Sequence, residues 1–147
     1  MANKPLWSLK QSAVVPFISK NGVTEVVLVR SSSNKNWVIP KGRIENFMSP
    51  EDSAAKEAFE EAGVVGDVSN EVFAEYKYTK RGDVCHVKVY PLEVSKILVV
   101  WDEMNKRKRR VVKVGKAIGL IKKDQKGILR KFREMLMMPN GLSLNDV

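Results

Sequence analysis

The sequence is poor in the residues that build disulfides and zinc sites. Among 147 residues it has one cysteine, Cys85, and one histidine, His86. A single cysteine cannot form an internal disulfide, which fits a reducing compartment, and the two residues together cannot supply a structural zinc site. We therefore expect a cytoplasmic protein without a zinc site of that kind.

Long apolar runs are missing as well. Ile97–Trp101 is about the longest, whereas a membrane-spanning helix needs roughly 20 residues. The apolar stretch Ala13–Ile18 near the N-terminus is broken by Pro16, which argues against a signal peptide. The glycine patterns of the phosphate loop and the dinucleotide-binding loop are also absent. These absences predict a protein that is not embedded in a membrane and uses neither of those loops.

Charge is abundant and unevenly placed. Lys and Arg total 26 against 17 Asp and Glu, which gives a net charge of +9. Residues 1–105 hold 13 basic and 14 acidic side chains, whereas residues 106–134 hold 13 and 2. This basic C-terminal quarter points to a polyanionic partner. The length suits a single domain, which we place over residues 1–147 with a frayed tail at 139–147.

Turn signals and hydrophobic periodicity predict an α+β domain, with helices packed on a mixed sheet. The turn Asn21-Gly22 predicts a hairpin, and a second antiparallel pair is expected to turn near Arg81-Gly82-Asp83. In that pair, alternation places Cys85, Val87 and Val89 on one face and His86, Lys88 and Tyr90 on the other. The final helix is predicted to be capped by Asp124 and to carry an apolar stripe from Ile128 to Leu136. A loop is predicted over 41–48. The predicted strands are 13–18, 24–30, 37–39, two within 72–94, and 111–114.

The clearest helix start in the chain follows that loop. Ser49 can cap the helix and Pro50 suits its first position, while Gly63 supplies a left-handed stop after Ala62. We expect a helix over 50–62. Its predicted packing face consists of Ala55, Ala58, Phe59 and Ala62.

Three glutamates of this helix are predicted to share one face. Glu57, Glu60 and Glu61 stand at i, i+3 and i+4, and like charges at these spacings cost roughly 0.2–0.5 kcal/mol per pair. A solvated acidic face is the simplest interpretation of such a triple. A hard divalent cation would also relieve the repulsion, and oxygen ligands select Mg²⁺, with Mn²⁺ as a substitute.

The surrounding pattern resembles the Nudix box, G-x5-E-x7-R-E-U-x-E-E-x-G-U, in which U is apolar. The resemblance covers residues 42–64 and implies a Nudix fold, an α-β-α sandwich with a mixed sheet, and metal-dependent hydrolysis of a diphosphate linked to another group. It also implies that Glu57 and Glu61 bind metal, that Glu60 is a ligand or the general base, and that Glu103 is a second base or a ligand. The matching residues are Gly42, Glu57, Ala58, Glu60, Glu61, Gly63 and Val64.

Two positions depart from the box. Met48 stands where the first motif glutamate belongs, and Lys56 replaces the arginine. In the family these two side chains commonly pair and tie the loop to the helix, which Met48 cannot do. Glu45 and Glu51 are alternatives for anchoring the loop. We interpret the site as active, with a differently held loop.

The resemblance extends over residues 12–135 to diphosphoinositol polyphosphate phosphohydrolases and diadenosine polyphosphate hydrolases. It rests on segments 27–33, 36–40, 101–103, 107–109 and 112–114. It implies a phosphate-rich small-molecule substrate. The alternatives are a pyrophosphohydrolase acting on nucleoside triphosphates or RNA 5′ ends, and a non-catalytic module that binds nucleic acid. The oligomeric state stays open.

The run Lys106–Arg110 has three interpretations: a solvated flexible loop, a nucleic-acid patch, or a clamp for substrate phosphates. The Nudix resemblance favours the clamp. By the same resemblance, the backbone carbonyl of Lys41 is a further metal ligand. The predicted substrate-binding side chains are Lys10, Lys41, Arg43, Lys80, Arg81, Arg107 and Arg109.

Overall fold

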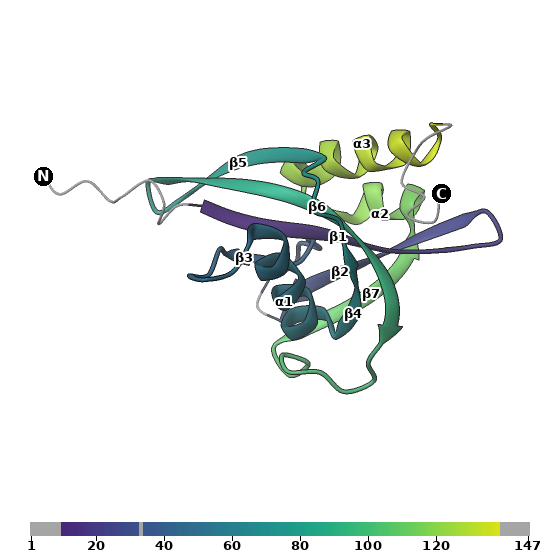
Figure 1. Ribbon diagram of the computed structural model, residues 1–147, viewed down its shortest axis with the longest axis horizontal. Helices are drawn as coiled ribbons and strands as arrows, with labels where there is room; N and C mark the ends of the chain where they lie inside the picture. Colours follow the sequence, from purple (N-terminus) through teal and green to yellow (C-terminus); the bar gives the residue numbers. More distant parts are fainter. Residues whose placement is uncertain (1–9, 33, 139–147) are drawn as a thin grey trace, which may run out of the picture.

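The protein was analysed as a computed structural model that describes residues 10–32 and 34–138 (Figure 1). The first half contains strands β1 (Lys10–Lys20), β2 (Val23–Ser31) and β3 (Lys41–Arg43), helix α1 (Pro50–Ala62) and strand β4 (Val64–Val68). The second half contains β5 (Ala74–Lys80), β6 (Asp83–Ile97), β7 (Arg107–Lys113), α2 (Val114–Leu120), a 3₁₀ turn η2 (Lys123–Gln125) and α3 (Lys126–Leu136).

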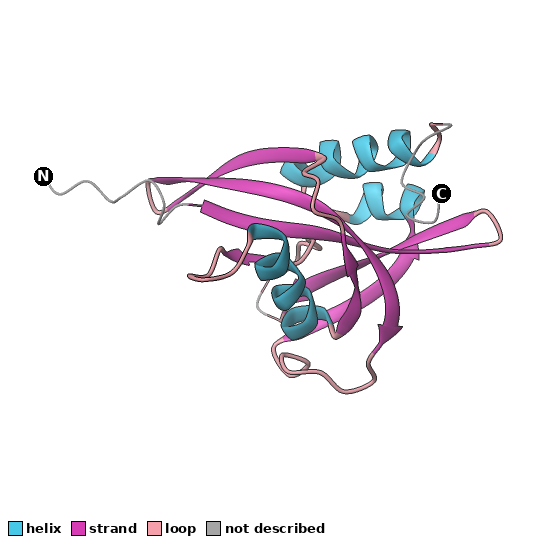
Figure 2. Ribbon diagram, viewed as in Figure 1, coloured by secondary structure: helices cyan, strands magenta, loops and turns pink. Residues whose placement is uncertain are grey.

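These strands form one mixed sheet with helices on both faces (Figures 1 and 2). The strand order is β4-β6-β1-β2-β7, with β3 paired to β1 and β5 paired to β6. β1 and β6 run parallel, and the other pairs run antiparallel. α1 packs on one face and α2 with α3 on the other. This layering confirms the predicted α+β class and the α-β-α sandwich.

The central strand β1 is buried on both faces. Ala13, Val15 and Phe17 belong to the core under α2 and α3, whereas Val14 belongs to the core under α1. Phe17 packs on Phe132 of α3, with ring centroids 5.4 Å apart. Burial on both faces explains why this segment is a nearly continuous apolar run instead of an alternating one.

The predicted first hairpin is confirmed. Asn21 and Gly22 both have positive φ, 53° and 79°, which matches the tight turn that joins twisted strands. β1 pairs with β2 only from Phe17 onward, and its first residues pair with β3 instead. The predicted strand at 37–39 is wrong, because these residues make only isolated bridges, from Val38 to β2 and from Trp37 to Ile121. The predicted loop at 41–48 begins with β3.

The second hairpin is confirmed and is longer than predicted. Cys85 and Val87 are buried on one face, and His86 and Lys88 are exposed on the other. Tyr90, on the face of His86, is buried in the core under α1. β6 extends to Ile97 because it also pairs with β1 and β4, and neither partner is adjacent to it in sequence.

The interpretation of Lys106–Arg110 as a flexible loop is wrong. Strand β7 begins at Arg107 and pairs with β2, with Arg109 opposite Val29 and Arg107 opposite Ser31. Strand alternation puts Arg107 and Arg109 on one face and Lys108 on the other. The sequence hides this strand because its partner, β2, lies about 80 residues earlier in the chain.

Two elements were not expected from the sequence, β4 and α2. β4 carries a glycine and takes its place through pairing with β6, and α2 carries two glycines and buries Val114 and Ala117. The apolar stripe of the final helix is confirmed by the burial of Ile128, Leu129 and Phe132. Asp124 is not its cap, because it lies in η2. None of the helices within 10–32 and 34–138 is long and apolar enough to span a bilayer. The predicted frayed tail at 139–147 lies outside the described residues.

Candidate active site

Helix α1 begins and ends where its capping residues predict. The Ser49 hydroxyl accepts a hydrogen bond from the Asp52 amide at 3.1 Å. Gly63 follows the helix in the left-handed region, with φ at 64°, and its amide donates to carbonyls of the last turn. Both signals are local, which is why this helix could be placed from sequence.

The buried face of α1 is rotated from the predicted one. Ala58 and Ala62 are buried as expected, but Phe59 is 47% exposed, and Ala54 and Glu61 are buried in its place. The sequence could not decide this rotation, because alanines lie on several sides of the helix. The contacts of Glu61 with the rest of the fold settle which side is covered.

The loop before α1 is held by one buried serine. Ser53, with no exposed surface, donates to the Arg43 carbonyl at 3.1 Å and accepts from the Glu45 amide at 3.1 Å. Beyond these contacts the loop turns outward: Phe47 is fully exposed, with φ at 67°. Ser53 therefore fixes the end of β3 and the start of the loop against α1.

Lys56 makes the second attachment of this loop. Its ammonium lies 2.9 Å from the Glu45 carboxylate and 3.0 Å from that of Glu60. Hydrogen bonds to these two carboxylates raise the pKa of Lys56. Of the two alternatives for anchoring the loop, Glu45 makes this contact, so the pair lost at Met48 is replaced by an ion pair from another loop position.

Glu57 and Glu61 form the centre of the site. Their side chains hydrogen-bond to each other, and Glu61 is only 5% exposed. Burial raises the pKa of Glu61 to about 8, against the opposing charge of Arg107, and burial also raises the pKa of Glu57. Gly42 leaves room for this pair, since a Cβ there would overlap the Glu57 carboxyl group. The buried Glu61 carboxyl and the partly exposed Glu57 carboxyl thus lie close together in surroundings that disfavour charge on both.

Strand β7 and the loop before it complete the acidic cluster. The Arg107 Nε donates to the Glu103 carboxylate at 2.8 Å, and its Nη2 lies 3.9 Å from Glu61. The Glu103 amide donates to the Glu60 carbonyl at 3.0 Å. Glu60, Glu61 and Glu103 are therefore brought to one place, and Arg107 is the cation that faces two of them.

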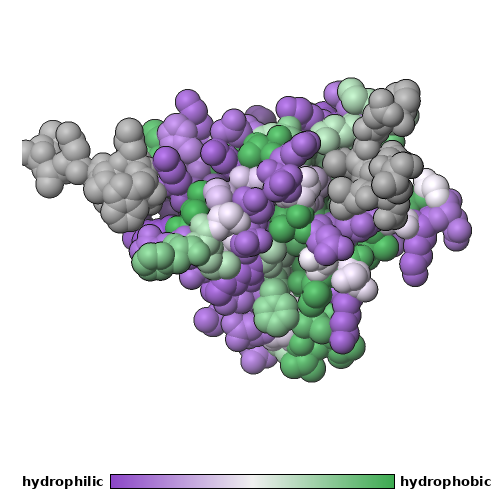
Figure 3. All heavy atoms as spheres, viewed as in Figure 1, coloured by the Kyte–Doolittle hydropathy of each residue, from purple (hydrophilic) through white to green (hydrophobic). Residues whose placement is uncertain are grey.

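The end of α1 is capped by side chains from the same loop and strand. The Trp101 indole donates to the Glu61 carbonyl at 3.0 Å, and Arg109 donates to the carbonyls of Ala62 and Leu98 at 2.9 and 2.8 Å. The Arg109 guanidinium lies 4.0 Å from the centre of the Trp101 ring. Figure 3 shows apolar residues gathered at the lower end of the molecule in this view. The Arg109 side chain therefore binds at the C-terminal end of α1.

Lys41 extends the site beyond the carboxylates. Its ammonium donates to the Tyr78 hydroxyl at 3.1 Å, and Tyr78 donates to the Gln11 amide oxygen at 2.6 Å. Burial lowers the pKa of Lys41, and the nearby Glu61 carboxyl opposes that shift. Tyr78 and Gln11 were not singled out in the sequence; their placement beside Lys41 depends on how β5, β1 and β3 come together.

The Glu57–Glu61 pair has the chemistry of a cation site. Across residues 10–32 and 34–138, no three His, Cys, Asp or Glu side chains are arranged to hold a metal ion, and Glu60 is bound to Lys56. However, two neighbouring carboxyls whose pKa values are raised by burial are a donor set whose charge a divalent cation can neutralise. Their hard oxygen atoms suit Mg²⁺. The residues present therefore fit the ion.

Comparison with known proteins identifies the fold family. The NUDIX domain model matches residues 9–132. The chain belongs to the Nudix family. This confirms the resemblance seen in the box, and Nudix hydrolases are also its relatives by sequence.

Two curated relatives illustrate the range of Nudix sequences that match. Nudix hydrolase 21, chloroplastic, from Arabidopsis thaliana is 35% identical over 102 residues, which cover 67% of this chain and 51% of that protein. Diphosphoinositol polyphosphate phosphohydrolase 2 from Rattus norvegicus is 34% identical over 115 residues, covering 76% and 62%. The chain spans about half the length of the first curated relatives it matches.

Solved Nudix structures share the fold. A C. elegans Ap4A hydrolase in a binary complex superposes with a TM-score of 0.74 at 20% identity, covering 87% of this chain and 97% of that one. The NUDIX domain of Shewanella oneidensis NrtR, complexed with ADP ribose, gives 0.71 at 16% identity, covering 88% of each. At these identities the likeness is one of fold.

The predicted substrate residues do not all gather at the Nudix carboxylates. Lys41 and Arg107 lie beside Glu61. Arg43 is exposed at the end of β3, and Arg81 is exposed in the β5–β6 turn. Lys80 is exposed next to that turn, Lys10 lines a separate cavity, and Arg109 caps α1.

Proposed function

We propose that this Nudix domain is a metal-dependent hydrolase that cleaves a phosphoanhydride bond in a phosphate-rich small molecule. The observation that carries the proposal is the Glu57–Glu61 pair, in which Glu61 is buried and faces Arg107, with the Lys41 ammonium close enough for its pKa to be influenced by Glu61. An acidic centre with basic neighbours suits a metal ion and a polyphosphate together. The substrate classes we favour are diadenosine polyphosphates and diphosphoinositol polyphosphates, in keeping with the names of the rat relative and the C. elegans structure.

Glu57 and Glu61 would hold Mg²⁺, or Mn²⁺ in its place, with Glu60 and the Lys41 carbonyl as further predicted ligands. When bound, such an ion supplies charge neutralisation at a phosphoryl oxygen and makes water more acidic. Lys41 and Arg107 then bind the remaining phosphate oxygens. Arg43 and Arg81 are exposed, and their part in substrate binding stays a prediction.

Glu60 and Glu103 are the candidates for general base. One oxygen of Glu60 is bound by Lys56 at 3.0 Å, and one oxygen of Glu103 is bound by Arg107 at 2.8 Å. In each case the second carboxylate oxygen would take the proton of the attacking water.

Arg109 has a different task in this proposal. Its guanidinium donates to two backbone carbonyls and stacks on Trp101, so we assign it to the end of α1 instead of to the substrate. A cytoplasmic location stays a prediction, because several relatives are named mitochondrial or chloroplastic.

The test is hydrolysis of a substrate panel with and without Mg²⁺. The panel contains a diadenosine polyphosphate, a diphosphoinositol polyphosphate, a nucleoside triphosphate and an RNA with a 5′ triphosphate. We expect Mg²⁺-dependent turnover of the first or second substrate. Turnover should fall about 100-fold or more in Glu57→Gln and in Glu60→Gln, because ligand and base both act in the transition state.

Three results would contradict this assignment. Full activity of Glu57→Gln would remove it from the metal site. Preference for the triphosphates would favour the pyrophosphohydrolase alternative. Absence of turnover on every substrate, together with RNA binding, would indicate a non-catalytic module. Asp67→Asn, an exposed carboxylate on β4, is the matched control and should retain activity.

A further inference from the structure

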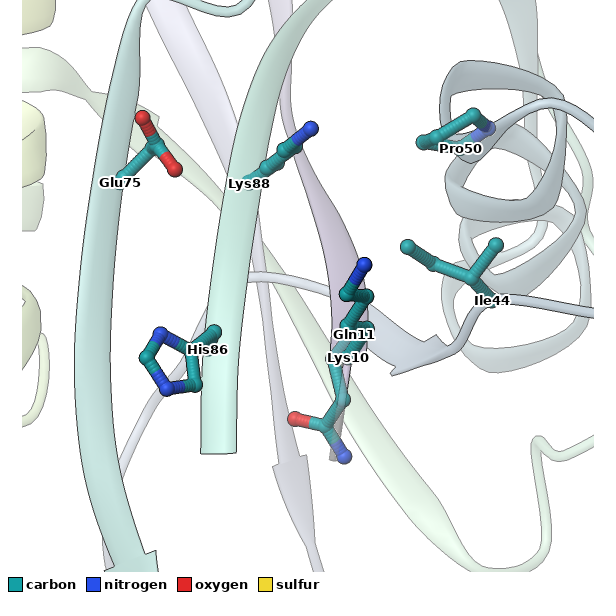
Figure 4. A pocket seen from close by; sticks show the side chains of 7 residues that line it. All are labelled: Lys10, Gln11, Ile44, Pro50, Glu75, His86 and Lys88. Atoms are coloured by element: carbon teal, nitrogen blue, oxygen red, sulfur yellow. The ribbon is translucent and has the colours of Figure 1, made fainter. Parts of the chain in front are cut away.

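A cavity lies beside the start of α1, and its lining residues do not include the carboxylates of the candidate active site. Its volume is about 450 Å³, within the range of small-molecule sites. Figure 4 shows β5, β6 and β1 along one side and α1 on the other. The lining residues are Lys10, Gln11, Ile44, Pro50, Glu75, His86 and Lys88. None of the glutamates at the candidate active site lines this cavity, and neither does Lys41 or Arg107.

The sheet places three basic side chains in a row, of which two, Lys10 and His86, line this cavity. Lys77 of β5 is opposite His86 of β6, and His86 is opposite Lys10 of β1. Neighbouring strands are about 4.8 Å apart, so the three residues occupy adjacent positions on one face. Like charges placed directly opposite destabilise a sheet. Within the described residues, none of the three side chains forms an ion pair or a side-chain hydrogen bond.

A second row of facing residues lies beside the first on the same face of the sheet, and we call the two rows the strip. Glu75, Lys88 and Ser12 are opposite one another on β5, β6 and β1. Ser12 has no exposed surface, and its hydroxyl has no hydrogen-bond partner. Strand alternation places it on the face of Lys10, next to Lys88. Ser12 itself does not line the cavity; among the described residues, Lys10, His86 and Lys88 line it together with one carboxylate, that of Glu75.

We propose that this cavity is a second binding site, for a small phosphorylated molecule of about mononucleotide size. Lys10, Lys88 and His86 bind the phosphate group, since charge-assisted hydrogen bonds to phosphate are strong. Ile44 and Pro50 close the opposite side and provide an apolar wall for the rest of the ligand (Figure 4). A bounded cavity favours a small ligand over a long strand. The proposal does not depend on the proposed hydrolase activity.

The single histidine makes the site directly observable. We would titrate the full chain with adenosine 5′-monophosphate and with inorganic phosphate in the presence of EDTA, and follow the imidazole resonances of His86 by NMR. We expect a saturable shift with the nucleotide at concentrations below about 20 mM. The double variant Lys10→Ala/Lys88→Ala should weaken binding about tenfold or more, because it removes two charge-assisted contacts.

The matched control removes the same charge from the same two strands at their other ends. Lys20→Ala/Lys96→Ala, at exposed positions of β1 and β6, should bind like the parent. Equal weakening in both double variants would show general electrostatic attraction and would overturn the proposal. Absence of a saturable His86 shift in the parent would also overturn it.

Two further arms test where the nucleotide binds and how long a ligand the strip accepts. Glu57→Gln should bind the nucleotide as the parent does; loss of binding there would place the ligand at the carboxylate site instead. A short oligouridylate should bind no better than the monophosphate. Much tighter binding of the oligonucleotide, lost in Lys10→Ala/Lys88→Ala, would identify the strip as a strand-binding surface and refute a small-molecule site.

Discussion

Two clusters of like kind in this molecule differ in burial. One is the acidic pair Glu57–Glu61, and the other is the basic row Lys77–His86–Lys10. In the acidic pair Glu61 is buried and Glu57 is partly buried, so the pKa values of both carboxyls are raised, and Arg107 faces Glu61. The basic row is exposed, so water screens it. Burial turns a like-charge cluster into a group that must take up a proton or a cation. Exposure leaves it as a weak attractor for anions.

The largest effect expected on the acidic side comes from Gly42→Ala. The new Cβ would overlap the end of the flexible Glu57 side chain, which can swing away at little cost in folding. Displacing a catalytic group by about 1 Å lowers rate about 100-fold. We therefore expect kcat/KM to fall by about that factor while the unfolding midpoint in urea changes little. A large loss of stability with normal kcat/KM would show that Glu57 is not poised for catalysis.

An intermediate effect is expected from pH and Mg²⁺. The pKa of Glu61 is raised to about 8 in the fold from an ordinary 4.5, so the folded state holds a proton that the unfolded chain releases first. The resulting stability is fully present below about pH 4.5 and is lost as pH rises through about 8. With EDTA present, the free energy of unfolding should therefore fall from pH 5 to pH 8.

Mg²⁺ should reverse that loss, because the ion replaces the proton and binds only the folded site. We expect Mg²⁺ to raise the melting temperature by a few degrees at pH 8 and by less at pH 6. Glu61→Gln provides the comparison, since it should flatten the pH dependence and abolish the Mg²⁺ effect. An unchanged response in this variant would remove Glu61 from the metal site.

The smallest effect is expected on the basic side, from Lys77→Glu. This change places a carboxylate opposite His86 on β5, where the parent has the basic Lys77. Opposite charges in directly facing positions of a sheet contribute roughly 0.2–1 kcal/mol. Urea unfolding at pH 6 should show a gain near the lower end of that range, because the row is exposed. A loss of stability would mean that the row is not repulsive in the free protein.

Local signals explain what could be predicted about the site. The caps Ser49 and Gly63 placed α1, and the spacing of Glu57, Glu60 and Glu61 placed three carboxylates near one another on it. These features depend on residues within a few positions of each other. The rotation of the helix was different: with alanines on several sides, Phe59 was wrongly expected to be buried.

Features that join distant segments could not be predicted in the same way. Lys56 and Glu60 are one helical turn apart, so their contact is local, but the contact of Lys56 with Glu45 depends on how the loop folds back. Arg107 and Arg109 looked equivalent in a basic run. The pairing of β7 with β2 directs Arg107 to Glu61 and Glu103, and places Arg109 at the carbonyls of Ala62 and Leu98.

The sequence by itself determined the Nudix family, the α+β class and the capped helix with its glutamates, because capping and helical periodicity are written in consecutive residues. Only the tertiary structure decided which basic side chains face the carboxylates and which form the row on β5, β6 and β1. Strand partners can lie some 80 residues apart, and their register is set by burial on both faces of the sheet, which no short segment encodes. The two charge clusters therefore differ in their burial, and burial cannot be inferred from the order of charged residues in the chain.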